Sequence, residues 1–255
     1  MNFIYYNISN SNDINKGGIK FMSAKYQQIV DDIEKDILGG KYNTTKKLPT
    51  EEELVLKYEV SRTTIRKAIG ILARKGYIYQ VQGSGMFVRE AILKGYVSLE
   101  TLKGLTRDFP NREIVSKVVS IEILEADEIL AHKMKCSVGT NVYYVKRLRI
   151  LDGHTFSMEY SYYNKDIVPY LNEDIAKASI YTYITEDLKL NIGFADKVIY
   201  ADKMDKESSE LLGLEMSDPA LVIENTGFLN NGDIFEVSKV IHNYKYVKLL
   251  KLATF

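Results

Sequence analysis

The chain has 255 residues, of which 45% are hydrophobic and 27% are charged, and this composition is typical of folded globular proteins. It excludes a disordered, collagen-like or disulfide-dense chain, and the length suits one large domain or two ordinary ones. The 34 basic and 34 acidic residues give a formal net charge of zero, which argues at first against a nucleic-acid partner.

The two signs of charge are unevenly distributed. Residues 1–89 carry 14 basic and nine acidic residues, so the rest of the chain carries an excess of five acids. Residues 60–89 contain six basic residues and no acid. Such a basic stripe is typical of a nucleic-acid-binding module attached to a second domain, although a solvated helix face explains it equally well.

Compartment signals in the sequence favour the cytoplasm. The single cysteine, Cys136, cannot form an intrachain disulfide, which fits a reducing environment. No apolar run reaches the ~18 residues that span a membrane, so we expect no membrane partner. Residues 1–22 lack the basic and apolar regions of a signal peptide and predict a disordered leader, and Met22 could serve as an internal start.

Three helices are predicted in the basic N-terminal part. The first begins near Ser23, carries apolar residues at spacings of three and four, and ends at Gly39-Gly40. The second begins after Thr50, which is a good N-cap in front of three glutamates that suit the helix dipole. The third ends at Gly76 and buries a separate apolar stripe.

The third predicted helix also has a basic face, because Arg62 and Arg66 lie one turn apart on it. Two short strands follow over 77–81 and 86–88, and the glycines of the Gln-Gly-Ser-Gly turn between them permit positive φ and close approach to a partner. Three helices followed by a hairpin predict a winged helix-turn-helix domain over residues 23–90.

The chain changes character after a predicted linker at 91–97. Strands rich in Val, Ile and Tyr are predicted over 114–123, 141–150, 156–163, 194–200, 220–229 and 234–242. Helical stretches are predicted near 125–135, 173–176, 180–190 and 205–213. Long strands joined by tight turns, with segregated helices, predict an α+β domain around an antiparallel sheet over residues 98–255.

Several motifs carry a resemblance to a known family. Three motifs resemble the DNA-binding domain of the GntR family of bacterial transcription regulators. They are Leu48-Pro-Thr-Glu, Val60-Ser-Arg-Thr-Thr-Ile-Arg-Lys-Ala, and the run from Gly76-Tyr-Ile to Gln-Gly-Ser-Gly-Met-Phe-Val. The remainder resembles the HutC-type effector domain of that family, known as UTRA, which is similar to the chorismate lyase fold. Its signs are Ser116-Lys-Val, Val145-Lys-Arg-Leu-Arg, Glu159-Tyr-Ser-Tyr-Tyr, Ser179-Ile-Tyr and Phe235-Glu-Val-Ser.

The resemblance implies that the third helix enters the major groove of double-stranded operator DNA. Arg62 is the first choice for reading a base, since a guanidinium pairs bidentately with guanine, and Arg66 reaches phosphate or base. The other residues expected at the DNA are Thr50, Ser61, Thr63, Thr64, Gln82, Gly83 and Gly85. Related regulators often carry Arg at the position of Glu52, and the wing tip lacks the usual Arg or Lys, so moderate salt sensitivity is expected.

A ligand site is predicted in the second domain. Arg147 and Arg149 alternate along a strand and so point to one face, where they repel unless an anion or carboxylate lies between them. On spacing alone, a surface pair is the more common explanation. Ser179 stands before a helical stretch, either as a simple N-cap or as part of an anion site beside Tyr181.

The resemblance implies a site for the phosphate of a phosphorylated sugar, held by Arg147, Arg149, Ser179 and Tyr181. It implies that Glu159 and Glu236 bind sugar hydroxyl or amino groups, although a buried Glu beside an Arg is also a common internal pair. Gly104 stands where phosphosugar binders often have Ser, so a backbone amide is expected to grip the phosphate there.

The expected protein is a homodimeric transcription regulator, a repressor of sugar-utilisation genes, that responds to a small-molecule effector and needs no cofactor. An enzyme acting on a small anionic substrate is the alternative, with Glu159 and Glu236 as an acid–base pair, and a constitutive architectural DNA binder is a third class. No P-loop, dinucleotide fingerprint or nucleophile elbow is present. His132, His154 and His242 lack metal-ligand spacing, so no metal is expected.

Overall fold

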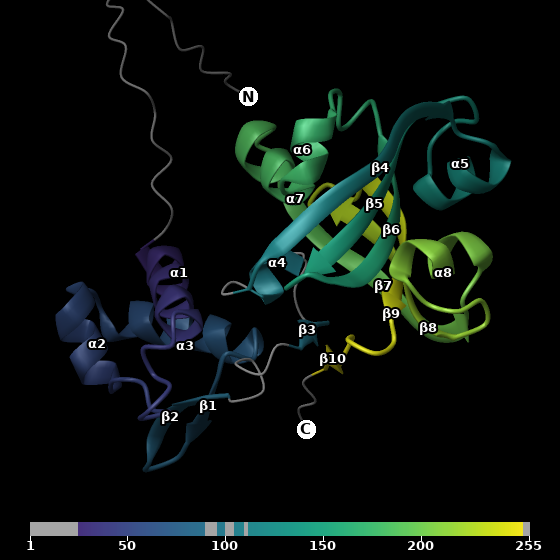
Figure 1. Cartoon of the computed structure of the whole chain (residues 1–255). Helices are drawn as coiled ribbons and strands as arrows, with labels where there is room; N and C mark the ends of the chain where they lie inside the picture. The colour runs from purple at the N-terminus through teal and green to yellow at the C-terminus, as the bar shows by residue number, and fades with distance from the viewer. Residues whose placement is uncertain (1–24, 90–95, 100–104, 110–111, 252–255) are drawn as a thin grey trace, which may run out of the picture.

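The computed structural model describes residues 25–89, 96–99, 105–109 and 112–251, and Figure 1 shows the arrangement of their helices and strands. The predicted leader at 1–22, Ser23 and Gly104 lie outside the described residues, as does most of the predicted linker at 91–97. Within the described residues, no helix is both long and apolar enough to cross a membrane.

The N-terminal part is a winged helix-turn-helix. Its elements are α1 (Lys25–Leu38), α2 (Glu51–Tyr58), α3 (Arg62–Arg74), β1 (Ile78–Val81) and β2 (Gly85–Val88), the last two paired antiparallel. Ile33, Leu54 and Ile65, one from each helix, are almost completely buried in one cluster. The spacing of apolar residues therefore decides which side of each helix faces the core, as the sequence predicted.

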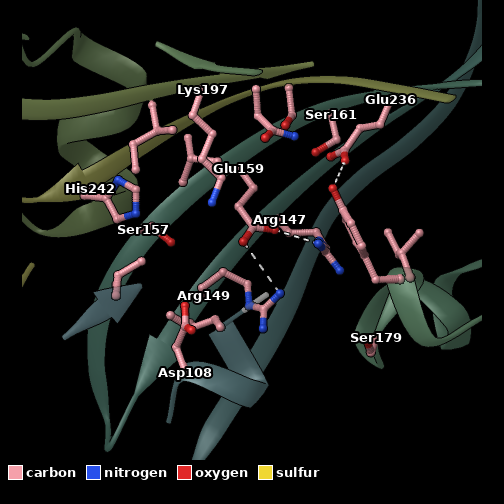
Figure 2. A pocket seen from close by; sticks show the side chains of 18 of the residues that line it. Asp108, Arg147, Arg149, Ser157, Glu159, Ser161, Ser179, Lys197, Glu236 and His242 are labelled. Carbon is pink, nitrogen blue, oxygen red and sulfur yellow. Dashed lines mark hydrogen bonds and ion pairs between the residues drawn. The ribbon is translucent and has the colours of Figure 1, made fainter. Parts of the chain in front are cut away.

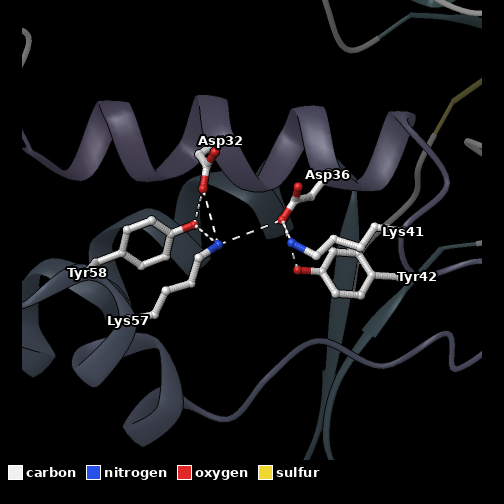
Figure 3. A network of polar contacts seen from close by, with 6 residues as sticks. All are labelled: Asp32, Asp36, Lys41, Tyr42, Lys57 and Tyr58. Carbon is white, nitrogen blue, oxygen red and sulfur yellow. Dashed lines mark hydrogen bonds and ion pairs between the residues drawn. The ribbon is translucent and has the colours of Figure 1, made fainter.

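Polar side chains fix the ends of α2 and its contact with α1. Thr50 and Glu53 form a capping box, in which Thr50 Oγ1 accepts from the Glu53 amide and Glu53 Oε2 accepts from the Thr50 amide. At the other end, Tyr58 donates to Asp32 of α1 at 2.5 Å, and Figure 3 shows this contact within a larger polar network. The network consists of Asp32, Asp36, Lys41, Tyr42, Lys57 and Tyr58. It ties α2, which precedes the recognition helix, to α1.

The C-terminal part is built on a six-stranded antiparallel sheet in the order β4-β5-β6-β9-β8-β7. The strands are β4 (Ile114–Glu125), β5 (Asn141–Leu151), β6 (His154–Asn164), β7 (Ile192–Lys203), β8 (Pro219–Leu229) and β9 (Ile234–Asn243). This arrangement confirms the predicted antiparallel α+β domain. Strands β5, β6, β9 and β8 lie in the middle of the sheet, where both faces can be covered (Figure 1).

Helices cover the two faces of the sheet. The helices are α5 (Glu128–Met134), α6 (Glu173–Lys177), α7 (Ile180–Thr182), a π-helix (Tyr183–Asp187) and α8 (Lys206–Leu212). Strand β5 shows the division, because Val142 and Leu148 pack in the clusters that contain α5 and α8. Tyr143 and Val145 point the other way, into the cluster that contains α6 and α7.

Some elements differ from the prediction. The helix expected over 180–190 is one turn of α7 followed by the π-helix, and the helical stretch ends before 190, where the chain turns into the left-handed region at Lys189. Strand β3 (Val97–Ser98) pairs in parallel with β10 (Leu249–Leu250), and α4 (Leu105–Asp108) follows it. These three short elements carry no periodic pattern, so the sequence did not predict them.

Candidate DNA-binding surface and effector pocket

The basic face of α3 is open to solvent. The side chains of Arg62 and Arg66 are 54% and 64% exposed, while Ile65 and Ala68 of the same helix are fully buried. Both guanidiniums already have an acidic neighbour on α2: Arg62 Nη2 donates to Glu52 Oε1 at 3.0 Å, and Arg66 Nε donates to Glu51 Oε2 at 2.9 Å. These pairs were not predicted from the sequence.

The hydroxyl groups expected at the DNA are partly engaged in capping. Ser61 is the N-cap of α3 and accepts from the Thr64 amide, and its hydroxyl is 2.9 Å from that of Thr64. Thr50 donates its hydroxyl to Glu53 within the capping box. Thr63 is exposed beside them on α3. Their phosphate contacts therefore stay predictions, and Thr63 is the hydroxyl best placed to make one.

The wing is a tight, glycine-dependent hairpin. Gln82 and Gly83 are exposed at its tip, and Gly83 and Gly85 adopt φ values of 75° and 116°, which other residues rarely adopt. A Cβ atom on Gly85 would lie 2.9 Å from Lys47 Cε. Lys47 thus supplies, from a different segment, a cation beside a wing whose own tip has none, and the sequence analysis missed it.

The predicted effector residues meet in one cavity of about 160 Å³ on the sheet face that α6 and α7 cover. Six of the seven line it, and Figure 2 labels most of them: Arg147, Arg149, Glu159, Ser179, Tyr181 and Glu236. The seventh, Gly104, is not among the described residues. The alternation along β5 therefore does place both arginines on one face, as predicted.

An arginine–glutamate–arginine trio forms one end of the cavity. Arg147 Nη2 donates to Glu159 Oε2 at 2.6 Å, and Arg149 Nη1 lies 3.6 Å from Glu159 Oε1 (Figure 2). Arg147 Nη1 also donates to the Ala176 carbonyl at 2.9 Å. The two arginines are 6% and 5% exposed, so the surface-pair explanation is wrong.

Burial and charge oppose each other in this trio. Burial would raise the pKa of Glu159, but the charges of Arg147 and Arg149 outweigh it and lower that pKa. Burial lowers the pKa of Arg149, the charge of Glu159 opposes this effect, and the charge of Arg147 adds to it. The Nε atoms of both arginines are buried and have no hydrogen-bond partner among the described residues. The trio thus holds two guanidiniums and a single carboxylate.

A carboxyl group bound by two tyrosines forms the other end. Tyr163 donates to Glu236 Oε1 at 3.3 Å, and Tyr181 donates to Glu236 Oε2. Burial raises the pKa of Glu236, although the hydroxyls of Tyr181 and Ser238 oppose this effect. Both oxygens of Glu236 therefore already accept from protein donors. A ligand would meet Glu236 through the tyrosines or by displacing them.

Ser179 and four further polar residues lie between the two ends of the cavity. Ser179 caps α7, since its Oγ accepts from the Thr182 amide at 3.2 Å, so the N-cap explanation holds locally. Ser157, Ser161 and Asn225 also line the cavity, and Asn225 Oδ1 is buried without a partner among the described residues. Lys197 reaches it from β7. The sequence did not predict these four as lining residues: Ser161 lies within the Glu159-Tyr-Ser-Tyr-Tyr motif, of which only the glutamate was expected at the ligand, and no motif marks the other three.

His242 also lines the pocket, and burial lowers its pKa to about 4. Because the unfolded chain binds a proton below about pH 6.5 and the folded chain does not, His242 contributes stability that is lost as the pH falls from 6.5 toward 4. We expect His242→Gln to reduce the loss of unfolding free energy between pH 7 and pH 5 by about 2 kcal/mol. Urea unfolding at both pH values measures this, with the exposed His132→Gln as the control. An equal pH dependence in all three proteins would refute it.

The chemistry of the pocket suits binding. Among the described residues, no group of three or more His, Cys, Asp or Glu side chains could hold a metal ion. Glu159 and Glu236 have partners at both oxygens, the first in ion pairs and the second in hydrogen bonds. Neither carboxyl group has the free proton-transfer position that general acid–base work needs.

Family models match both parts of the chain. The model described as "Bacterial regulatory proteins, gntR family" matches residues 25–88, and the UTRA domain model matches residues 111–248. The first covers the winged helix-turn-helix and the second covers the sheet with its pocket.

Similar proteins agree with these matches. The uncharacterized HTH-type transcriptional regulator YydK of Bacillus subtilis is 41% identical over 87% of this chain and 94% of its own length. Its crystal structure superposes with a TM-score of 0.77, covering 91% of this chain and all of the other at 38% identity. The B. subtilis regulator TreR is 30% identical over 90% of this chain and 97% of its own length.

A third relative is the mannosyl-D-glycerate transport/metabolism system repressor MngR of Escherichia coli, 28% identical over 89% of this chain and 95% of its own length. A structure described as the effector binding domain of the B. subtilis trehalose repressor matches with a TM-score of 0.51 at 26% identity, covering 55% of this chain and 98% of that one. These relatives are transcription regulators rather than enzymes. The chain therefore belongs to the GntR family of bacterial transcription regulators and carries the UTRA effector domain of the HutC-like branch.

Proposed function

We propose that this regulator represses sugar-utilisation genes in the cytoplasm and is released from its operator when a phosphorylated sugar binds in the UTRA pocket. In this proposal a homodimer binds a near-palindromic operator, with one winged helix on each half-site. Residues 23–90 bind the DNA, residues 91–97 link the two domains, and residues 98–255 bind the effector.

The observation that carries the effector class is the buried trio of Arg147, Glu159 and Arg149. Arg147 and Arg149, at 6% and 5% exposure, share the carboxylate of Glu159, so the trio itself carries one more positive than negative charge, which is costly to bury; Asp108 also lines the cavity. An anion beside the arginines offsets that cost. The two partnerless Nε atoms add donors, and phosphate oxygens match the fork geometry of a guanidinium.

The rest of the lining favours a sugar as the carrier of that phosphate. Hydroxyl and carboxamide groups of Ser157, Ser161 and Asn225 lie along the cavity, with the tyrosine-bound Glu236 beyond them. Sugar hydroxyls are both donors and acceptors, so they can pair with such groups and with the partnerless Asn225 Oδ1. Two relatives are named as repressors for trehalose and for mannosyl-D-glycerate, which are sugar compounds.

Release requires the sugar phosphate to bind one arrangement of the dimer more tightly than the other. A coupling free energy of about 1–3 kcal/mol is typical for such linkage, and it lowers operator affinity about 5- to 150-fold. A constitutive architectural DNA binder would lack this coupling, so the response to ligand separates the two classes.

Two measurements on the full chain test the proposal. Operator sequences are selected from a randomised duplex library, and thermal unfolding is screened against phosphorylated mono- and disaccharides. We expect an enriched near-palindrome, at least one stabilising sugar phosphate that weakens operator binding, and loss of that stabilisation in Arg147→Ala. If a sugar phosphate stabilises Arg147→Ala as much as the unmodified protein, Arg147 does not contact the effector. An enriched operator that no sugar phosphate releases would refute the effector class.

A further inference from the structure

The three glutamates at the start of α2 have different partners. Glu53 closes the capping box with Thr50 and so stabilises the helix end. Glu51 and Glu52 instead reach across to α3, where they contact Arg66 and Arg62 at 2.9 and 3.0 Å. Favourable interaction with the helix dipole therefore does not account for all three carboxylates, since two of them hold the guanidiniums of the recognition helix.

Each ion pair leaves part of its guanidinium available. Arg66 donates to Glu51 through Nε, so both of its terminal Nη groups stay available as a fork. Arg62 donates to Glu52 through Nη2, which leaves Nη1 and Nε. A paired arginine of this kind is held in one orientation and can still donate to a further acceptor. Guanine O6 and N7 in the major groove are such acceptors.

The two carboxylates also change the charge of this surface. Each exposed arginine is matched by one carboxylate, so the pairs are close to neutral instead of carrying two positive charges. Phosphates, which attract any exposed arginine regardless of sequence, are repelled by the neighbouring carboxylate. A guanine edge carries no net charge, so its hydrogen bonds with the arginine suffer much less from the carboxylate.

We infer that Glu52, assisted by Glu51, is a specificity-determining positioning residue, which orients the recognition-helix arginines toward base edges and weakens their attraction to DNA of arbitrary sequence. This inference rests on the proposed operator binding by α3. Glu52 is 74% exposed, so its contribution to folding is small and its effect falls on DNA binding.

Three substitutions separate positioning from net charge. Glu52→Gln removes the charge, and Glu52→Asp keeps the charge but shortens the side chain so that it cannot hold Arg62 in the same way. Asp31→Asn is the matched control, because Asp31 is an exposed acid on α1 whose recorded contact is with Gln27. Binding to a short duplex of random sequence is measured by fluorescence anisotropy over a series of KCl concentrations. Sites are also selected from a randomised library with each protein.

We expect Glu52→Gln to bind the random duplex about two- to fivefold more tightly than the unmodified protein. Its plot of log K against log[KCl] should steepen by about one unit for each arginine that gains a phosphate contact. The sites that Glu52→Gln selects from the library should show a weaker base preference at the position that Arg62 reads. Glu52→Asp should keep the affinity for random duplex and lose definition at the same base, while Asp31→Asn should match the unmodified protein.

Two results overturn the inference. One is an unchanged salt slope and an unchanged enriched site in Glu52→Gln. The other is tighter binding to random DNA with a fully preserved enriched site, because the carboxylate would then act through net charge alone. Failure of the proposed function looks different, since in that case the unmodified protein enriches no site at all.

Discussion

Arg62→Ala is expected to weaken operator binding by about 1,000-fold while leaving effector binding unchanged. A well-placed arginine–guanine contact discriminates by about 1–3 kcal/mol, and a homodimer loses it in both half-sites. Because a tenfold change in affinity corresponds to about 1.4 kcal/mol, the loss of two contacts amounts to about three orders of magnitude at mid-range. The side chain is 54% exposed and packs into no cluster, so the domain should fold normally.

Arg74→Ala is the matched control for this prediction. Arg74 is also exposed on α3, but it lies three turns further along, in the last turn of the helix. Its removal lowers the net charge equally and should reduce binding slightly and uniformly across sequences. Gel-shift titrations with the selected operator and with random duplex measure both effects. Equal losses for the two variants would show that Arg62 contributes charge rather than base reading.

The sequence predicted the DNA-binding domain well because its signals are local. A period of three to four residues fixes each buried stripe, and Thr50 and Ser61 mark helix starts through hydrogen bonds that span three residues. The pairs of Arg62 with Glu52 and of Arg66 with Glu51 were not predicted. They depend on how the turn at Glu59 sets α2 against α3, which no periodic pattern reports.

The effector pocket was predictable along single strands but not across the sheet. Alternation on β5 placed Arg147 and Arg149 on one face, and the possibility of an internal carboxylate partner was recognised. The strand register then brings Glu159 opposite Arg147. Asn225 on β8 was not predicted. Its place in the pocket depends on the pairing of β8 with β9, and no local motif in the sequence reports that pairing.

The charge imbalance of the trio leads to a prediction that two pocket variants differ in stability and in their response to phosphate. Glu159→Gln removes the carboxylate that Arg147 and Arg149 share, whereas Arg147→Met leaves Glu159 and Arg149 as a balanced pair. Breaking a buried pair by removing one charge costs about 3–5 kcal/mol, so Glu159→Gln should unfold at a clearly lower temperature in phosphate-free buffer. Arg147→Met should lose less stability, although the Ala176 carbonyl loses its donor.

Inorganic phosphate separates the two variants further. It should stabilise Glu159→Gln more than the unmodified protein, because the anion then offsets two guanidiniums, and it should stabilise Arg147→Met hardly at all. Calorimetric unfolding with and without phosphate measures both shifts. Glu207→Gln is the control, since it removes a carboxylate that pairs with Lys146 outside the pocket. Equal phosphate shifts in Glu159→Gln and Arg147→Met would mean that the arginines are structural, because an anion held by their charge must stabilise the first variant more than the unmodified protein and the second one less.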